Sequence, residues 1–145
     1  MKTNLNELRD KIHKNAVEKG FYDGETLTMG CLVEMNREQR QSLKHVFFAQ
    51  KIALIHSEVS EALEADRKGK YADRKTFENF LKSNKGNGFQ TIFDARIKNT
   101  VEDEFADIII RTLDLCGRMN IDIDWHVEQK MKYNSMREPM HGKKY

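Results

Sequence analysis

The sequence predicts an all-α protein whose main helices form a four-helix-bundle-like fold. A single proline among 145 residues leaves long stretches without a helix breaker. Glu, Lys, Leu, Ala and Met, which all have strong helix propensity, are abundant along the chain. Apolar residues also recur every three or four positions, which is the spacing of one helix face. For a chain of this length, we expect a single domain over residues 1–145.

The N-terminal part predicts a helix, a loop and a long second helix. The first helix ends at Gly20, and its apolar residues are Leu5, Leu8, Ile12 and Ala16. Residues 20–37 carry three glycines and show no sustained period, so we interpret them as a loop that closes over a site. The long helix runs from about Ser42 to Arg67 and ends at Gly69. Its apolar stripe consists of Val46, Ile52, Ile55, Val59 and Ala62.

Residues 70–99 form weaker elements between two strong ones, and we interpret them as an inserted segment. A short helix is predicted over Asp73–Lys82, and the following SNKGNG is a helix breaker. Phe89, Ile92 and Phe93 predict a second, weak helix.

Two further helices complete the chain. Thr100 and Asp103 form a near capping box at the start of a helix that runs to about Met119. Its predicted buried residues are Val101, Phe105, Ile108, Ile109 and Leu113. Asp122 or Asp124 caps a last helix to about Met136, and Pro139 prevents its continuation.

Composition argues against several classes of protein. The N-terminus MKTNLNELRD lacks the apolar core of a secretion signal, and no apolar run approaches the roughly 18 residues of a membrane span. Cys31 and Cys116 lack metal-type spacing, so we expect two reduced thiols in a cytoplasmic protein. A net charge of +2 is too small to indicate nucleic acid as a partner.

Two pairs of acids are the main candidates for chemistry. Glu58 and Glu61 lie on the long helix, and Glu104 and Asp107 lie on the helix that begins near Thr100. The i, i+3 spacing places each pair on one helix face, one turn apart. Two such helices packed side by side would bring four carboxylates together, which suits a hard cation such as Mg²⁺.

The same acids are also compatible with simpler roles on a helix surface. A single E-x-x-E is most often a solvated helix face, and Asp107 with Arg111 could form an i, i+4 salt bridge. Glu58, however, borders the apolar stripe, and like charges one turn apart cost stability unless something neutralises them. Neither acidic pair has the histidine of the Glu-x-x-His motif found in di-iron bundles, because residues 61 and 107 are Glu and Asp. An all-carboxylate set favours Mg²⁺, with Mn²⁺ as a substitute, over iron or zinc.

The C-terminal end carries the opposite charge. Its cations are Lys130, Lys132, Arg137, Lys143 and Lys144, with His141 as a further donor and Glu138 as the one acid. By composition alone, such a stretch is more often a solvated basic tail. Lys and Arg side chains also suit phosphate oxygens, so beside a carboxylate–metal site they indicate a polyphosphate ligand. No P-loop or dinucleotide-binding glycine motif is present.

Three motifs in this order resemble those of MazG-like nucleoside triphosphate pyrophosphohydrolases. EVSE at 58–61 and EFAD at 104–107 are similar to the E-x-x-E…E-x-x-D signature of that family. KMKYNSMREPMHGKKY at 130–145 resembles the C-terminal end of many small members. The resemblance covers about residues 42–69 and 100–145. The gap between the acidic motifs, 62–103, is longer than the family usually shows.

The resemblance implies a MazG-type all-α fold, usually oligomeric, in which Glu58, Glu61, Glu104 and Asp107 hold Mg²⁺. It implies hydrolysis of a nucleoside triphosphate between the α and β phosphates, giving the monophosphate and pyrophosphate, as in nucleotide-pool house-cleaning. One carboxylate would take the proton of the attacking water. The candidate phosphate contacts are Lys130, Asn134, Arg137 and Lys143. Because relatives include dimeric dUTPases, dCTP pyrophosphatases and phosphoribosyl-ATP pyrophosphohydrolases, a narrower substrate of these kinds is an alternative.

A non-enzymatic alternative is an oligomeric helical binding module whose acids form salt bridges with the basic tail. We expect a dimer or tetramer, since a short helical chain has more apolar faces than it can cover alone. We expect no membrane partner, because the apolar runs are short. The sequence does not predict the preferred base. Four aromatic residues could stack on a base: Phe47, Phe48, Trp125 and Tyr133. Aromatic residues at helical spacing, however, belong more often to a core than to a base site.

Overall fold

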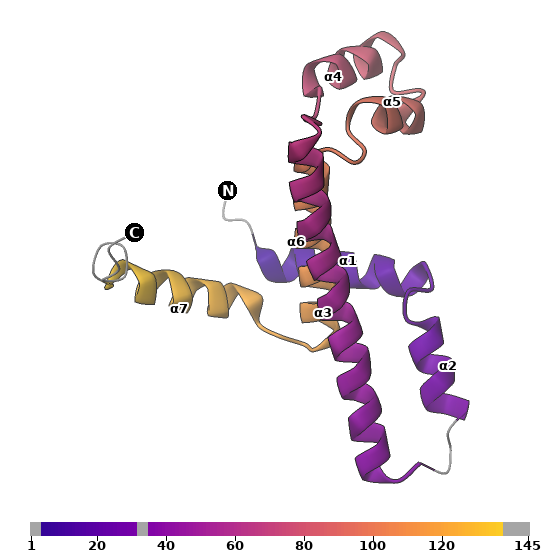
Figure 1. Cartoon of the computed structure of the whole chain (residues 1–145), viewed down its shortest axis with the longest axis vertical. Coiled ribbons are helices and arrows are strands. Elements are labelled where there is room, and N and C mark those ends of the chain that lie inside the picture. Colours follow the sequence, from indigo (N-terminus) through magenta and orange to yellow (C-terminus); the bar gives the residue numbers. More distant parts are fainter. Residues whose placement is uncertain (1–3, 32–34, 138–145) are drawn as a thin grey trace. The chain divides into compact units, whose positions relative to one another are not determined.

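The computed structural model describes residues 4–31 and 35–137, and this part of the chain is helical without strands, which confirms the all-α class. The described helices are α1 (Leu5–Glu18), α2 (Asp23–Cys31), α3 (Arg37–Arg67), α4 (Arg74–Ser83), α5 (Phe89–Arg96), α6 (Val101–Arg118) and α7 (Ile123–Ser135) (Figure 1). None of these helices contains an apolar stretch of the length that a membrane span requires.

The chain divides into two compact units, and each is described by itself. The terminal unit comprises residues 1–22 and 113–145, so far as they are described, and the central unit comprises residues 23–112. Helix α6 contributes residues 101–112 to the central unit and residues 113–118 to the terminal unit.

In the terminal unit, acids at the start of α7 hold the start of α1. Asp124 accepts hydrogen bonds from the backbone N–H groups of Leu5 and Asn6, at 2.9 and 3.0 Å. The Asn6 amide donates to Asp122 at 2.8 Å. Asp122 is also the N-cap of α7, because it accepts from the Trp125 N–H. These bonds satisfy backbone donors that the first turn of a helix leaves without partners.

Helix α2 corrects the prediction that residues 20–37 form a loop. Asp23–Cys31 is helical, with Asp23 and Glu25 in its first turn, where acids interact favourably with the helix dipole. The Thr28 hydroxyl donates to the Gly24 carbonyl one turn earlier. Glycines interrupt the apolar period of this segment, which favours a loop by pattern, yet a short helix tolerates them at a modest cost. Part of the predicted loop, residues 32–34, lies outside the described residues.

The long helix α3 begins earlier than predicted, at Arg37 instead of Ser42. A capping box explains the earlier start: the Asn36 side chain accepts from the Gln39 N–H, and the Gln39 side chain accepts from the Asn36 N–H, both at 2.9 Å. At the other end, Lys68 caps the helix and Gly69 adopts a positive φ of 63°, as the predicted stop at Gly69 requires.

Residues 70–99 fold into a pair of short helices in the central unit, α4 and α5, which Figure 1 shows next to each other beyond the end of α3. Asp73 caps α4 through the Thr76 N–H at 3.0 Å. Phe77 packs edge-on against Phe89 and Phe93, with ring centroids 5.6 and 6.3 Å apart. Both predicted helices of this segment are therefore present, and aromatic packing holds them together.

The predicted apolar faces of α3 and α6 are mostly uncovered, which corrects the expected core. Among the predicted stripe residues, only Ala62 and Leu113 are buried; Val46, Ile52, Val59, Phe105 and Ile109 are exposed. The buried part of α3 consists of Glu58, Ala62 and Ala65. The buried face of α3 therefore includes an acid and lies to one side of the predicted apolar stripe. Apolar periodicity alone does not predict this.

Candidate functional site

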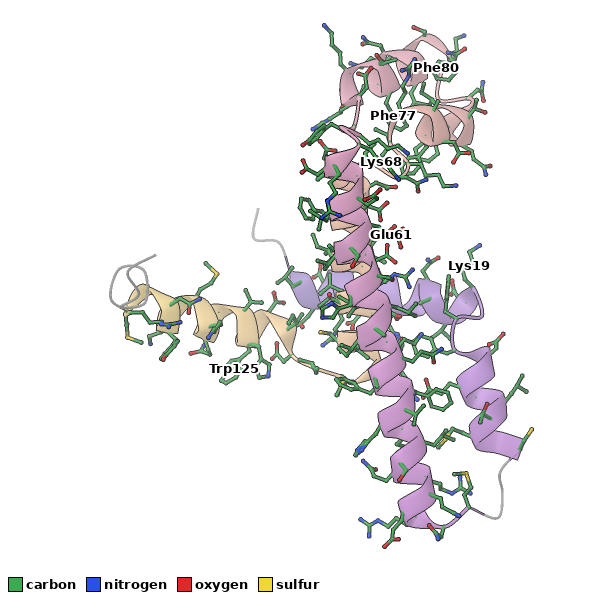
Figure 2. All side chains as sticks on the ribbon, viewed as in Figure 1. Lys19, Glu61, Lys68, Phe77, Phe80 and Trp125 are labelled. Carbon is green, nitrogen blue, oxygen red and sulfur yellow. The ribbon has the colours of Figure 1, made fainter. Side chains whose placement is uncertain are left out.

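Three of the four predicted acids lie together in the central unit. Glu58, Glu61 and Glu104 each offer a carboxylate oxygen, and these three oxygens lie within 4.8 Å of one another. Glu58 and Glu61 come from α3 and Glu104 comes from the first turn of α6, so two helices build the group (Figure 2 labels Glu61). We call these three residues the acidic cluster.

The three acids differ in their access to solvent. Glu58 is 5% exposed and Glu104 is 4% exposed, whereas Glu61 is exposed. Burying ionised carboxylates is costly unless a counter-charge or hydrogen bonds compensate for the lost hydration. Glu61 therefore leaves one side of the acidic cluster open to solvent, so an ion or ligand can reach the two buried acids.

Arg111 provides positive charge at the cluster. Its Nε lies 2.6 Å from Glu58 Oε1, which joins α6 to α3 through an ion pair. Among the described residues this pair takes the place of the alternative i, i+4 salt bridge between Asp107 and Arg111, since no ion pair joins those two side chains. The sequence offers no signal for the observed pairing, because it depends on how α3 and α6 are placed against each other.

The electrostatics of Glu104 reflect burial and crowding of like charges. Burial raises the pKa of the Glu104 carboxyl to about 7, with further contributions from the charge of Glu61 and from a hydrogen bond and charge of Glu58. The Glu104 carboxyl therefore keeps its proton to a higher pH than an ordinary glutamate. In its protonated form it donates a hydrogen bond to the Glu58 carboxylate, which reduces the repulsion between the two acids.

Asp107, the fourth predicted acid, lies outside the group of three but close enough to feel its charge. Burial raises the pKa of the Asp107 carboxyl, and the charges of Asp103, Glu58 and Glu61 raise it further, while Arg111 lowers it. Asp107 is thus an adjoining carboxylate, one turn along α6 from Glu104.

The donor set fits a hard divalent cation. All of the cluster's candidate ligand atoms are carboxylate oxygens from Glu58, Glu61 and Glu104, and oxygen donors are those that Mg²⁺ and Mn²⁺ prefer. A bound cation would also offset the repulsion between acids that one Arg111 only partly neutralises.

The predicted phosphate contacts belong to the terminal unit. Lys130, Asn134 and Arg137 lie on or directly after α7 and are exposed. The Lys130 amine and the Arg137 guanidinium both lie over the Tyr133 ring, 5.1 and 5.8 Å from its centroid. These two predicted cations are therefore brought together by one aromatic ring. The other predicted residues of this end, which are Glu138, Pro139, His141, Lys143 and Lys144, lie outside the described residues.

The terminal unit also contains a polar cluster that the sequence analysis missed. Asp114 Oδ1 lies 2.8 Å from His13 Nδ1, and the Tyr22 hydroxyl donates to Asp114 Oδ2 at 2.7 Å. The rings of His13 and Tyr22 pack edge-on at 5.1 Å. Asp114 is about a hundred positions from His13 and Tyr22 in the sequence, and the three residues show no common motif. Both carboxylate oxygens of Asp114 already have donors, so this cluster is satisfied by the protein itself.

Comparison with known proteins gives no match. No protein-family model, no curated protein and no solved structure is similar to this chain at the level that would indicate a relationship.

Proposed function

We propose that the chain is a Mg²⁺-dependent nucleoside triphosphate pyrophosphohydrolase of the MazG-like kind. The observation that carries the proposal is the acidic cluster: Glu58 and Glu61 from α3 and Glu104 from α6 bring their oxygens within 4.8 Å of one another. The same residues belong to the EVSE and EFAD motifs on which the resemblance rests. The cluster is both the place where like charges most need a cation and the place where the resemblance expects one.

In this proposal, the acidic cluster with Asp107 holds the cation. A bound Mg²⁺ supplies charge that neutralises the triphosphate and lowers the pKa of a water molecule. One of the carboxylates accepts the proton of the water that attacks the substrate. The buried positions of Glu58 and Glu104 keep their carboxylates fixed, whereas the exposed Glu61 faces the side from which substrate arrives.

The expected reaction cleaves the bond between the α and β phosphates and yields a nucleoside monophosphate and pyrophosphate. Lys130, Asn134, Arg137 and Lys143 are the proposed phosphate contacts, on the strength of the resemblance alone. Cationic and amide donors of this kind stabilise negative charge as pyrophosphate leaves. Narrower substrates, namely dUTP, dCTP or a phosphoribosyl nucleotide, are variants of the same reaction.

Product analysis with a matched pair of variants tests the proposal. The full-length chain is incubated with a panel of nucleoside and deoxynucleoside triphosphates, with Mg²⁺ or with EDTA. We expect Mg²⁺-dependent release of pyrophosphate and monophosphate, and Glu61→Gln should lower kcat/KM by about a hundredfold or more. Glu64→Gln removes the same charge one turn further along α3, from an exposed acid paired with Lys68, and should leave turnover unchanged. Release of single phosphate, or full activity of Glu61→Gln, would refute the proposal.

One observation favours a second, non-enzymatic candidate. The Glu58–Arg111 ion pair shows that a cluster acid already takes part in an interhelical salt bridge, as the binding-module alternative requires, although its partner is on α6 and not in the basic tail. If that bridge is the whole role of the acids, EDTA and added Mg²⁺ will leave the unfolding midpoint unchanged and no triphosphate will be hydrolysed.

A further inference from the structure

A groove in the central unit adjoins the acidic cluster. It has a volume of about 1040 Å³ and lies between α4, α5 and the first turns of α6. Asp103 and Asp107 line the part formed by α6. Asp107 interacts electrostatically with Glu58 and Glu61, so this part of the groove is near the cluster. Small-molecule sites usually have volumes of about 300–1,000 Å³, so the groove is large enough for a ligand of nucleotide size.

The part of the groove formed by α4 and α5 is aromatic. Phe77, Phe89 and Phe93 line it, and Figure 2 shows Phe77 lying between the two short helices. Phe89 and Phe93 are stacked, with centroids 5.7 Å apart and planes inclined by 23°. Phe89 nevertheless remains 55% exposed. Its ring therefore has free surface on which another flat ring can stack.

The charged and polar groups of the groove favour an uncharged ligand in its aromatic part. Arg74 and Lys98 both line the groove, but each is paired with an acid four residues away, at 2.6 and 3.4 Å. The positive charge of each side chain is therefore already paired within the protein, which makes this part of the groove a poor site for phosphate. Gln90 and Asn99 also line the groove and carry amide groups, which both donate and accept hydrogen bonds. Such groups can recognise the edge of a heterocyclic base.

We propose that this groove binds the nucleoside of a nucleoside phosphate, with the base stacked on Phe89 and the phosphates directed towards the acidic cluster. The α4–α5 segment, which the sequence marks as an insertion, then supplies the base-binding wall of the site. This inference rests on the proposed function for the nature of the ligand, but it concerns binding and does not require hydrolysis.

Binding of nucleoside monophosphates to the full-length chain tests the proposal. AMP, GMP, CMP and UMP are titrated by calorimetry in the presence of saturating Mn²⁺; as products of the proposed reaction, they undergo no turnover. Phe89→Ala should weaken binding about tenfold, as expected for loss of one stacking partner. Phe89→Leu keeps most of the packing volume but lacks the aromatic ring, and should weaken binding to a similar extent. Gln90→Ala should change the order of preference among the four bases.

Phe105→Ala is the matched control, because Phe105 is also 55% exposed but lies on α6 and does not line the groove. It should bind the monophosphates as the unmodified chain does, and Phe89→Ala should bind Mn²⁺ alone with unchanged affinity. Equal effects of Phe89→Ala and Phe105→Ala, or no monophosphate binding by the unmodified chain, would overturn the inference. Phe89-dependent binding without pyrophosphate release would refute the proposed function and leave this inference intact.

Discussion

Two carboxylate sites in this chain have opposite surroundings. In the terminal unit, Asp114 is surrounded by donors, since His13 and the Tyr22 hydroxyl occupy both of its oxygens. In the central unit, Glu58, Glu61 and Glu104 face one another, and the one ion pair that the structure describes for them is with Arg111. The oxygens of the first carboxylate are occupied by protein donors, whereas in the second group burial and the neighbouring acids raise the pKa of Glu104 to about 7.

The difference separates structural acids from candidate ligand-binding acids. A carboxylate with two protein donors gains nothing from an added cation. Acids that lie close together with too little positive charge repel one another, and a bound cation reduces this repulsion. The metal-free form of such a group is therefore the less stable one. Replacing one carboxylate by an amide in each group should therefore change stability with opposite sign.

The largest expected effect is at Asp114. Asp114→Asn should destabilise the chain by about 2–3 kcal/mol, because hydrogen bonds to a charged acceptor are strong and the amide NH₂ would face a donor. Urea denaturation at pH 7 in EDTA measures the change. Asp10→Asn is the control in the same unit: its side chain is 64% exposed beside Arg9, so its loss should be less than about 0.5 kcal/mol. An Asp114→Asn protein as stable as the unmodified chain would show that the terminal cluster is not structural.

In the absence of metal, Glu104→Gln should stabilise the folded chain, whereas Asp114→Asn should destabilise it. The folded pKa of about 7 lies above the ordinary value of 4.5, so the folded chain retains a proton that the unfolded chain loses as pH rises above 4.5. This contribution to stability is fully present below pH 4.5 and is lost as pH rises through 7. A glutamine does not titrate, so in EDTA at pH 8 the variant should be more stable than the unmodified chain by about 2 kcal/mol.

The control for this sign is Glu64→Gln. A hydrogen bond from Lys68 lowers the pKa of the exposed Glu64 carboxyl, so its replacement should give no gain in stability at high pH. Unfolding curves of all three proteins between pH 4 and 8 provide the comparison. A Glu104→Gln protein that is less stable at pH 8 would mean that Glu104 is stabilised by its neighbours, as Asp114 is.

The sequence predicts these two groups very unequally. Glu58, Glu61 and Glu104 can be selected from sequence, because i, i+3 acids bordering an apolar stripe are unusual on a helix that packs. His13, Tyr22 and Asp114 cannot, because their pairing depends on contacts between residues about a hundred positions apart. The same reason explains why the sequence offers Asp107 as an alternative salt-bridge partner for Arg111 but gives no sign of the observed pairing with Glu58.

The fold shows the same division between local and tertiary information. Caps and breakers such as Asp73, Gly69 and Asp122 act on neighbouring backbone, so the sequence predicts the helix ends that they form. The helix Asp23–Cys31 escapes prediction because its glycines weaken a short apolar pattern. The sequence predicts that Phe105 and Ile109 are buried, but both are exposed. Periodicity identifies an apolar face without showing whether another helix covers it.

The smallest expected effect concerns Arg111. Arg111→Gln should lower the stability of the metal-free chain by about 1 kcal/mol, because it leaves the buried Glu58 without its ion-pair partner; the loss is modest since the Arg111 side chain is 38% exposed. Arg74→Gln, which breaks the exposed pair with Glu78, is the control and should cost less. Millimolar Mn²⁺ should restore most of the stability lost in Arg111→Gln, because the cation replaces the missing positive charge at the acids. If Mn²⁺ restores nothing, the acidic cluster does not hold a cation, and Arg111 is a structural partner of the kind that His13 and Tyr22 provide for Asp114.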